Sequence, residues 1–467
     1  MARLLTGLSL GYFLVMLDTT IVTVALPALS PSLADQQWIS NGYTLTFAAF
    51  LLTAGAWSDR FGARRVFFTG LAAFAVLSGL SALASPALLI ALRALLGVAG
   101  ALLVPSSLSL IATAYPVPAA RAKAMGVWAA VSGTGLVAGP LLGGVLTEAF
   151  GWRAIFVVNV PVALIALALS RSAPSTPPKP GRMDVVSQLS AIVALSTLTY
   201  ALVEAAFWAL IPAAAAALVF LRAQRRPDAM LPRRLVSWGL LAGAIVNFGL
   251  SGVLFVLSLY FQQTRGYAPS ATGLAFLPLT IPTAFNPIFT GRLVARVGSR
   301  LPAVAGFSLM ASGTLLQAFA PSLSVLALAA VGFGVSLAIP SLLTAVVGAA
   351  PPDLSGIAGG ALNASRQTGA VLGVAVLGVL ASGTSAAFAL AAAAVILFAG
   401  GVSCSCVKRE TPSRLTLLDE SWLQGRKSLR NPLKKPFPRR DSSCPCPESW
   451  PESVAPCWPS ASSRRRR

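Results

Sequence analysis

Asp18 is the first residue of this sequence that could carry chemistry. It stands in MLDTTIVTVALPAL, residues 16–29, and is the only charged residue in that run. If the run crosses a membrane, a charge near its centre costs roughly 2.5–3.5 kcal/mol, so the side chain is expected to face a cavity or a partner. Two interpretations follow: a carboxyl group that takes up and releases protons, or a packing carboxyl group hydrogen-bonded by Thr19 or Thr20.

Arg93 and Glu204 are two further charges in apolar surroundings. Arg93 lies roughly 10 Å into its helix, where it could hold the counter-charge of a carboxylate or extend to the membrane surface. Glu204 is either a second titratable site or a loop residue, and the loop is the simpler interpretation. Because the chain has no histidine, proton chemistry must use carboxylates. We therefore predict Asp18, Arg93 and Glu204 as candidates for proton coupling.

The stretch GTGLVAGPLLGG, residues 133–144, places glycines and a proline inside an apolar run. Each glycine costs about 1 kcal/mol against alanine in a helix, and an interior proline costs about 3 kcal/mol, so close packing or a bend must compensate. Glycines four residues apart allow two helices to approach closely. The positions of interest are Gly135, Gly139, Pro140, Gly143 and Gly144.

A charged loop follows the second apolar run. In SDRFGARR, residues 58–65, Asp59 stands beside Arg60 and Arg64, with Gly62 between the two arginines. A solvated loop is the simpler interpretation of this spacing. The alternative is a latch of charges between neighbouring helix ends, which breaks and reforms as two parts of the protein move.

The elements that must position these residues are membrane helices. The chain has 467 residues, of which 56% are hydrophobic and 10% charged, and its mean hydropathy is +0.77. Apolar runs of about 17–25 residues recur along it, each long enough to cross a bilayer as a helix. They do not alternate in polarity as the strands of a membrane barrel do. We predict an all-α polytopic membrane protein with about fourteen helices, the seventh and eighth being the least distinct.

The basic residues of the short loops indicate the orientation. With the N-terminus in the cytoplasm, the inner loops hold sixteen lysines and arginines and the outer loops hold two, Arg153 and Arg265. Both termini are therefore expected on the cytoplasmic side. The net charge of +21 has the same origin, together with a basic tail, and does not indicate nucleic-acid binding.

An internal repeat relates the two ends of the apolar region. Shifts of 234 to 236 residues superpose three separate stretches, and the matched positions include Pro86 on Pro321, Gly97 on Gly332, Gly135 on Gly369 and Gly139 on Gly373. This pattern predicts two six-helix halves of the same orientation with a substrate path between them, and two inserted helices. Asp18 falls on Val253 and Arg93 on Leu328, so the fold does not need these charges twice.

The expected organisation has four parts. Residues 1–172 form the first half, 173–235 a linker with two extra helices, 236–402 the second half and 403–467 a basic tail. All five cysteines lie in the last 64 residues, so the body has no disulfide framework. The tail is expected to be disordered and cytoplasmic, or alternatively to be read in a shifted frame.

Five stretches of this chain resemble the major facilitator superfamily, and specifically its fourteen-helix drug:proton antiporter group. GAWSDRFGARR is similar to the superfamily's loop signature, and RALLGVAGA to the signature of its fourth helix, with Leu96 in place of a glutamine. GLVAGPLLGG matches the antiporter signature of the fifth helix. LDTTIVTVALP resembles the first-helix signature, with Thr23 where asparagine is usual, and NASRQTGAVLG resembles part of helix thirteen.

The resemblance implies proton-coupled efflux of small hydrophobic or aromatic compounds such as drugs, antibiotics and antiseptics. It makes Asp18 and Arg93 the coupling candidates, the 58–65 loop the cytoplasmic gate and the helix-five glycines an interface that limits leak. The candidate polar contacts to substrate are Asn247, Gln262 and Asn286. The alternatives are a proton symporter that imports a nutrient and, more remotely, a receptor or an enzyme.

The expected partners are a small-molecule substrate, protons and the lipid bilayer, with no nucleic acid. The body has no histidine, no cysteine and no clustered acids, so no cofactor, metal or enzymatic activity is predicted. The protein is expected in the cell's inner (plasma) membrane as a multi-pass monomer.

Overall fold

The computed structural model describes residues 2–175, 184–225, 238–350 and 355–405, and these ranges are helical without a strand. The first half has six passages, the last of them broken. They are α1 (Ala2–Leu29), α2 (Leu33–Phe61), α3 (Ala63–Leu83), α4 (Pro86–Ala114), α5 (Pro118–Phe150), and α6 (Ala154–Val157) continued by α7 (Asn159–Leu169).

Two helices follow that belong to neither repeat. They are α8 (Val185–Val203) and α9 (Leu210–Ala223), joined through the short 3₁₀ turn η1 (Phe207–Ala209). They pack on each other, and α8 also contacts α2 and α16. The two least distinct helices of the sequence are therefore a hairpin with Glu204 at its turn.

The second half repeats the six passages. It contains α10 (Trp238–Leu259) with the π-helical turn η3 (Tyr260–Thr264), then α11 (Pro269–Ala275), α12 (Leu277–Phe285) and α13 (Pro287–Val297) as one broken passage, then α14 (Arg300–Phe319), η4 (Pro321–Leu323) with α15 (Ser324–Ala349), α16 (Ser355–Gly383) and α17 (Ala386–Ser405).

The described helices account for the fourteen predicted passages. Nine are long and apolar enough to cross a membrane, and Ala154–Leu169, Phe207–Ala223 and Ala386–Val402 are shorter apolar passages. The other two are α2, which carries charges near both ends, and the α11–α13 segment. At 29 residues, α2 extends about 43 Å, more than the hydrocarbon thickness. The chain is a multi-pass membrane protein.

Prolines explain the broken passages. Proline lacks a backbone N–H group and its ring clashes with the carbonyl group four residues earlier, so it is tolerated best in the first turn of a helix. Pro161 lies just inside the start of α7, Pro278 is the second residue of α12, and Pro287 is the first residue of α13. In each case the chain starts a new helix in the same direction instead of continuing the old one.

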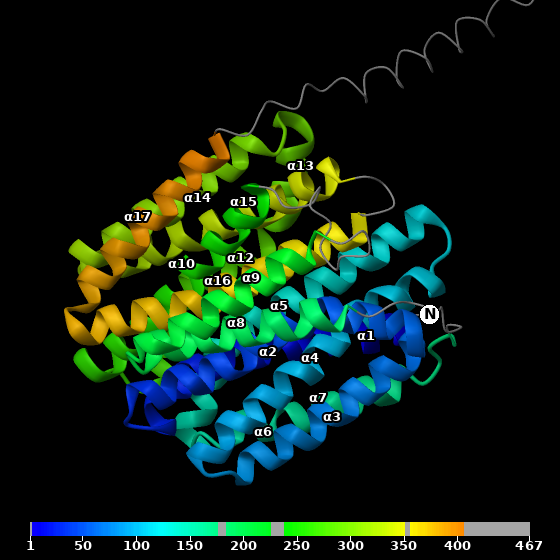
Figure 1. The fold of residues 1–467 in the computed structure, drawn as a ribbon, viewed down its shortest axis with the longest axis horizontal. Coiled ribbons are helices and arrows are strands. Elements are labelled where there is room, and N and C mark those ends of the chain that lie inside the picture. Colours follow the sequence, from blue (N-terminus) through cyan, green and yellow to red (C-terminus); the bar gives the residue numbers. More distant parts are fainter. Residues whose placement is uncertain (1, 176–183, 226–237, 351–354, 406–467) are drawn as a thin grey trace, which may run out of the picture. The chain divides into compact units, whose positions relative to one another are not determined.

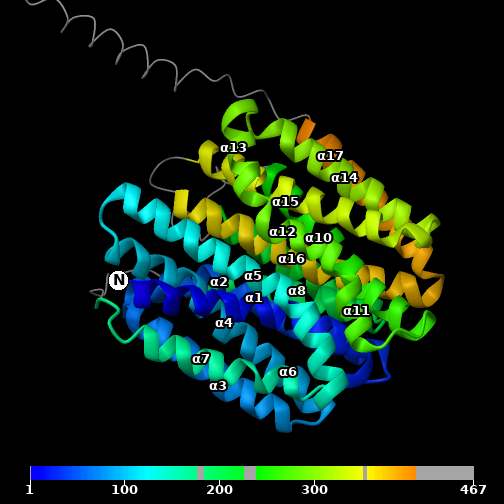
Figure 2. The same ribbon diagram turned by 180° about the vertical axis from the view of Figure 1, so that it is seen from behind.

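The two halves pack equivalent helices in the same way. α1 lies along α5 in the first half, and α10 lies along α16 in the second. In Figures 1 and 2 the blue and cyan helices of the first half lie beside the green to orange helices of the second, with α3 and α7 far from α14 and α17. Glycines permit close contact in both pairs, because a Cβ atom at Gly369 or Gly373 would overlap the α10 backbone at Ala244 or Phe248.

The part boundaries given above remain predictions. Residues 176–183, 226–237 and 406–467 lie outside the described residues, so the ends of the linker and nearly all of the tail do too. The prediction of a disordered or frame-shifted tail therefore stands as a prediction.

Candidate functional site

Asp18 and Arg93 form an ion pair inside the first half. Arg93 Nη1 of α4 contacts Oδ2 of Asp18 on α1, and the two side chains are 1% and 0% exposed. This is the only ion pair found among the described residues. The packing of α1 against α4 thus brings together two charges that are 75 residues apart in sequence.

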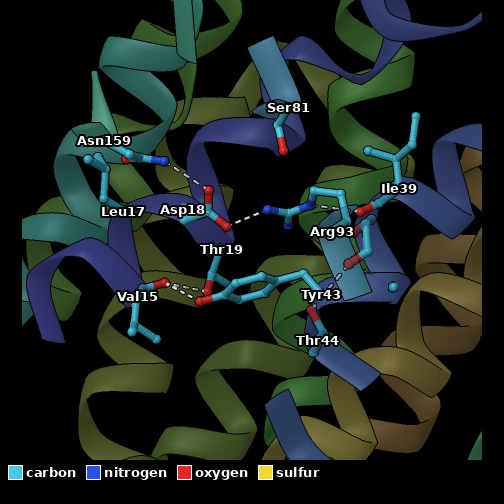
Figure 3. Close-up of polar contacts among 12 residues, drawn as sticks. Val15, Leu17, Asp18, Thr19, Ile39, Tyr43, Thr44, Ser81, Arg93 and Asn159 are labelled. Atoms are coloured by element: carbon cyan, nitrogen blue, oxygen red, sulfur yellow. Dashed lines mark hydrogen bonds and ion pairs between the residues drawn. The ribbon is translucent and has the colours of Figure 1, made fainter. Parts of the chain in front are cut away.

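Three neighbours fix the geometry of this pair (Figure 3). Asn159, at the start of α7, donates from Nδ2 to Oδ1 of Asp18 at 3.0 Å. Arg93 Nε donates to the carbonyl oxygen of Ile39 at 3.1 Å, and its guanidinium carbon lies 4.5 Å from the ring centroid of Tyr43. Both charged groups are therefore held from two sides, which compensates for part of the cost of burying them.

The glycines of α5 form a ridge against α1 at the level of the ion pair. A Cβ atom at Gly135 would lie 2.7 Å from the Phe13 carbonyl oxygen, and one at Gly139 would overlap the side chain of Thr20. Gly143 meets the α1 backbone one turn further on in the same way. Because the three glycines are four residues apart, they lie on one face of α5, and the close approach fixes the α1 turns that carry Asp18.

Gly144 and Pro140 lie at a different contact, between the two halves. A Cβ atom at Gly144 would overlap the backbone of Pro269 in α11, and the Pro140 carbonyl oxygen occupies the corresponding space beside Gly273. Glu148 Oε2 accepts a hydrogen bond from the Ser270 backbone at 3.1 Å nearby. The outer end of α5 is therefore seated against the outer end of the second half.

Further hydrogen bonds join the halves at the same level. Gln37 Nε2 donates to the carbonyl oxygens of Val374 and Ala375 at 2.9 and 3.0 Å. Ser258 Oγ donates to the Thr23 carbonyl oxygen at 2.7 Å. Among the described residues, every hydrogen bond between the halves lies toward their outer ends. An added Cβ atom at Gly126 or Gly291, on the inner parts of α5 and α13, would meet no atom within 4 Å.

A cavity of about 150 Å³ lies between the halves. Thr19, Thr20 and Thr23 of α1 line one side, and Asn247 of α10 lines the other. Asn247 Oδ1 accepts a hydrogen bond at 3.2 Å from Nε of Arg366, which also lines the cavity. Asn247 thus lies in the cavity lining, and its contact with substrate stays a prediction.

The two other predicted substrate contacts lie outside this lining. Gln262 donates to the carbonyl oxygen of Val24 at 2.8 Å, so its amide serves the contact between the halves. Its position in the π-helical turn η3, beyond the end of α10, explains the difference. Asn286 lies at the break between α12 and α13 and donates at 2.6 Å to Ser336, which is itself a lining residue.

Glu204 is separated from the other proton-coupling candidates. Its side chain is exposed at the outer turn between α8 and η1, and Oε1 accepts a hydrogen bond from Trp38 Nε1 at 2.8 Å. No contact with Asp18 or Arg93 is found among the described residues. Glu204 therefore lies at a turn, and its role as a second titratable site stays a prediction.

The predicted charged loop is shorter in the structure: Asp59 and Arg60 lie in the last turn of α2, Arg64 lies in the first turn of α3, and only Gly62 separates the two helices. Asp59, Arg60 and Arg64 are exposed, and no ion pair joins them in the described part of the chain. Arg64 Nη2 donates to the carbonyl oxygen of Arg171 at 3.1 Å, which ties this loop to the end of the sixth passage. Gly62 has a φ of +89° between the two helices, a conformation that favours glycine. The role of these residues as a gate stays a prediction.

Two residues of the site were missed by sequence reasoning. Asn159 is one of many polar residues near a helix end, and nothing in its neighbourhood marks it as a partner of Asp18. Arg366 carried a usable signal, because it is a cation in the middle of an apolar passage rather than in a loop. The residue lies in NASRQTGAVLG, the stretch that resembles part of helix thirteen.

The comparison with known proteins agrees with this geometry. A family model described as the Major Facilitator Superfamily matches residues 8–374 and 239–440. The chain belongs to the major facilitator superfamily. Superfamily membership accounts for the two parallel six-helix halves and for the cavity between them.

Several relatives within the superfamily are resistance and efflux proteins. The Methylenomycin A resistance protein of Streptomyces coelicolor is 34% identical over 443 residues, covering 85% of this chain and 90% of the relative. The Tetracenomycin C resistance and export protein of Streptomyces glaucescens is 36% identical, covering 80% and 75%. The Multidrug efflux pump LfrA of Mycolicibacterium smegmatis is 35% identical, covering 80% of each chain.

Solved structures share the fold at lower identity. An auto-inhibited peptide transporter of the POT family matches with a TM-score of 0.68 at 16% identity, covering 88% of this chain and 98% of that one. The human organic anion transporter MFSD10 matches with a TM-score of 0.62 at 18% identity, covering 86% and 99%. These likenesses establish the major facilitator fold of the chain.

Proposed function

We propose that this protein exports small hydrophobic or aromatic compounds, including antibiotics, across the cytoplasmic membrane in exchange for protons. The names of its relatives describe antibiotic resistance and drug efflux, which supports export. One chain contains both halves and the cavity between them, so we further propose that it works as a monomer.

The observation that carries the proton-coupling proposal is the ion pair directly behind the cavity wall. Asp18 is fully buried, while Thr19 and Thr20, its neighbours on α1, line the cavity. A rotation or shift of α1 by a fraction of a turn would therefore expose Asp18 to the cavity. The pair couples to substrate through this helix, without direct contact between the carboxylate and the exported compound.

Two states of the pair explain how a proton could drive transport. When Arg93 holds Asp18, the carboxylate charge is compensated and the site needs no proton. When α1 shifts relative to α4 and the pair separates, an isolated buried carboxylate is costly, and binding a proton neutralises it. We propose that the outward-open state takes up a proton in this way and that re-formation of the pair releases it to the cytoplasm.

The outer contacts between the halves support alternating access. In this structure Gln37, Ser258 and the outer end of α5 join the halves on the outer side, and no hydrogen bond between the halves is found among the described residues of their inner ends. This is the arrangement expected when the cavity opens toward the cytoplasm. Export then requires these contacts to break and the cytoplasmic ends to close.

A drug-susceptibility panel with matched variants tests the proposal. Cells expressing the chain should tolerate several hydrophobic antibiotics at least several-fold better than cells without it. Asp18→Asn, inserted at the same level, should lose this tolerance, whereas Glu204→Gln should keep it. Full tolerance with Asp18→Asn would show that the proton-coupling assignment is wrong.

Everted membrane vesicles separate export from import. In such vesicles the lumen corresponds to the outside of the cell, so an exporter that exchanges substrate for protons accumulates the compound when the lumen is acid. A proton symporter that imports a nutrient would instead lose its substrate from an acid lumen. Uptake that requires an acid lumen, and that is abolished by a protonophore, is the expected result.

A further inference from the structure

Arg366 is the only charged residue among those that line the cavity between the halves. The remaining lining is apolar or uncharged: it includes Tyr12, Thr44, Leu250, Thr283 and Gln367. The residue follows the first residue of α16 by 11 positions, about 16 Å along a helix of 29 residues. Arg366 thus lies within the membrane-crossing part of α16, where a charged side chain is expensive and marks a functional site by default.

No carboxylate in the described structure compensates this charge. Nε of Arg366 donates to Asn247 Oδ1 at 3.2 Å, and its Nη1 and Nη2 atoms donate no hydrogen bond to a described residue. The sequence explains why, because Asp353 is the only acidic residue between positions 229 and 409. Arg93, the other arginine inside the membrane, is by contrast fully paired with Asp18.

An aromatic surface lies in the same cavity. Tyr12 of α1 lines it and stacks on Trp128 of α5, with ring centroids 4.4 Å apart and an angle of 16° between the rings. Tyr12, held in place by this stacking, contributes an aromatic side chain from the first half, while Arg366 is contributed by the second. A ligand that contacts both elements has a planar apolar part and a group that accepts hydrogen bonds from a guanidinium.

We propose that the cavity selects anionic compounds, with Arg366 binding the carboxylate or another acidic oxygen group of a planar apolar molecule. This inference rests on the proposed efflux function, whose cavity it concerns. A guanidinium presents parallel N–H groups that match the two oxygens of a carboxylate, and the bond is strengthened by the opposite charges. Asn247 orients the guanidinium through Nε and leaves the Nη groups for the ligand.

The same charge acts against cationic compounds. A cation in this cavity would face Arg366 without any acidic lining residue to balance the repulsion. Selectivity therefore comes from attraction of one charge and rejection of the other, and the apolar and hydroxyl-bearing walls accept differences in shape.

Three probes with one ring system test the charge preference. Anthracene carboxylate, anthracenemethanol and anthracenemethylammonium are negative, neutral and positive at neutral pH and share a fluorescent ring. Equilibrium binding to the purified full-length chain in lipid nanodiscs is measured by fluorescence. We expect the carboxylate to bind at least about tenfold more tightly than the ammonium, since a hydrogen bond to a charged group is worth roughly a tenfold to hundredfold change in affinity.

Variants assign the preference to Arg366. Arg366→Gln should lower the affinity for the carboxylate about tenfold or more and leave anthracenemethanol within about twofold. Arg366→Lys should retain a preference for the carboxylate, since it keeps the charge. Arg292→Gln, at an exposed arginine of α13 outside the cavity, removes the same net charge and should change nothing.

The outcomes separate this inference from the proposed function. Equal or tighter binding of the ammonium by the unsubstituted chain overturns the inference, and so does an unchanged carboxylate affinity in Arg366→Gln. If the chain still exports antibiotics from cells in either case, the efflux function stands and only the charge selectivity fails. If the chain binds no probe and confers no resistance, both fail. The comparison of the three probes on the unsubstituted chain decides even if Arg366→Gln does not insert.

Discussion

Separating Asp18 from Arg93 by substitution should reveal a strong energetic coupling. In Arg93→Leu, the carboxylate keeps only its hydrogen bond from Asn159, and the contact of Arg93 with Tyr43 is also lost. Removing one partner of a buried ion pair costs about 3–5 kcal/mol of folding free energy. The cost in Arg93→Leu should fall at the lower end of this range, because the carboxylate that remains can be neutralised by a proton. Asp18→Asn should cost a similar amount, because a buried arginine cannot lose its proton.

The double variant Asp18→Asn with Arg93→Leu contains no unpaired charge. Its loss of stability should therefore fall short of the sum of the single losses by about 3 kcal/mol, which is the upper range for residues in contact. Reversible unfolding of the purified variants in mixed micelles, titrated with sodium dodecyl sulfate, gives the free energies for this cycle.

A matched pair of exposed charges provides the control. Asp59 lies in the last turn of α2 and Arg64 in the first turn of α3, and both are exposed and form no ion pair in the described structure. The cycle of Asp59→Asn and Arg64→Leu should be additive within about 0.5 kcal/mol. Additive losses for Asp18 and Arg93 as well would contradict the reasoning, since the pair would then carry no interaction energy.

Three further results are expected. Gly139→Val should abolish efflux at normal protein level, because the valine side chain would overlap Thr20. Gly126→Val on the same helix should retain efflux, because an added Cβ atom there meets no atom within 4 Å. Equal efflux by both variants would contradict the close contact between α5 and α1. Gln37→Leu removes two hydrogen bonds between the halves and should favour the outward-open state by about 1–3 kcal/mol. An impermeant maleimide should then label a cysteine placed at Thr23 faster than in the chain with Gln37. Unchanged labelling would show that this outer contact does not hold the halves together. Glu204→Gln should leave the pH dependence of transport unchanged, and a shifted profile would return Glu204 to the proton pathway.

Much of the fold follows from the sequence because the bilayer imposes strong rules. Each helix must bury its backbone polar groups by itself, so length and hydropathy locate the passages, and the loop arginines orient them. Even the uncertain hairpin around Glu204 was placed correctly. The breaks at Val158, Phe276 and Asn286 were not predicted, although Pro161, Pro278 and Pro287 could have indicated them.

The site could be predicted in type but not in its partners. The cost of a buried charge pointed to Asp18 and to Arg93, yet only helix packing decides that α1 and α4 bring them together, and that α7 adds Asn159. Gln262 shows that polarity alone does not locate a residue. Its polarity indicated a position in the cavity, but it lies in the π-helical turn η3 and contacts the other half instead.

Transport by Asp18→Asn in liposomes tests the central claim most directly. The purified chain is reconstituted and assayed with an antibiotic to which it confers resistance, once with an acid interior that drives uptake and once as exchange at equal pH. The account predicts that Asp18→Asn loses the pH-driven accumulation and keeps the exchange, while Glu204→Gln keeps both. Accumulation by Asp18→Asn at the rate of the unsubstituted chain would contradict the proposed role of the buried ion pair.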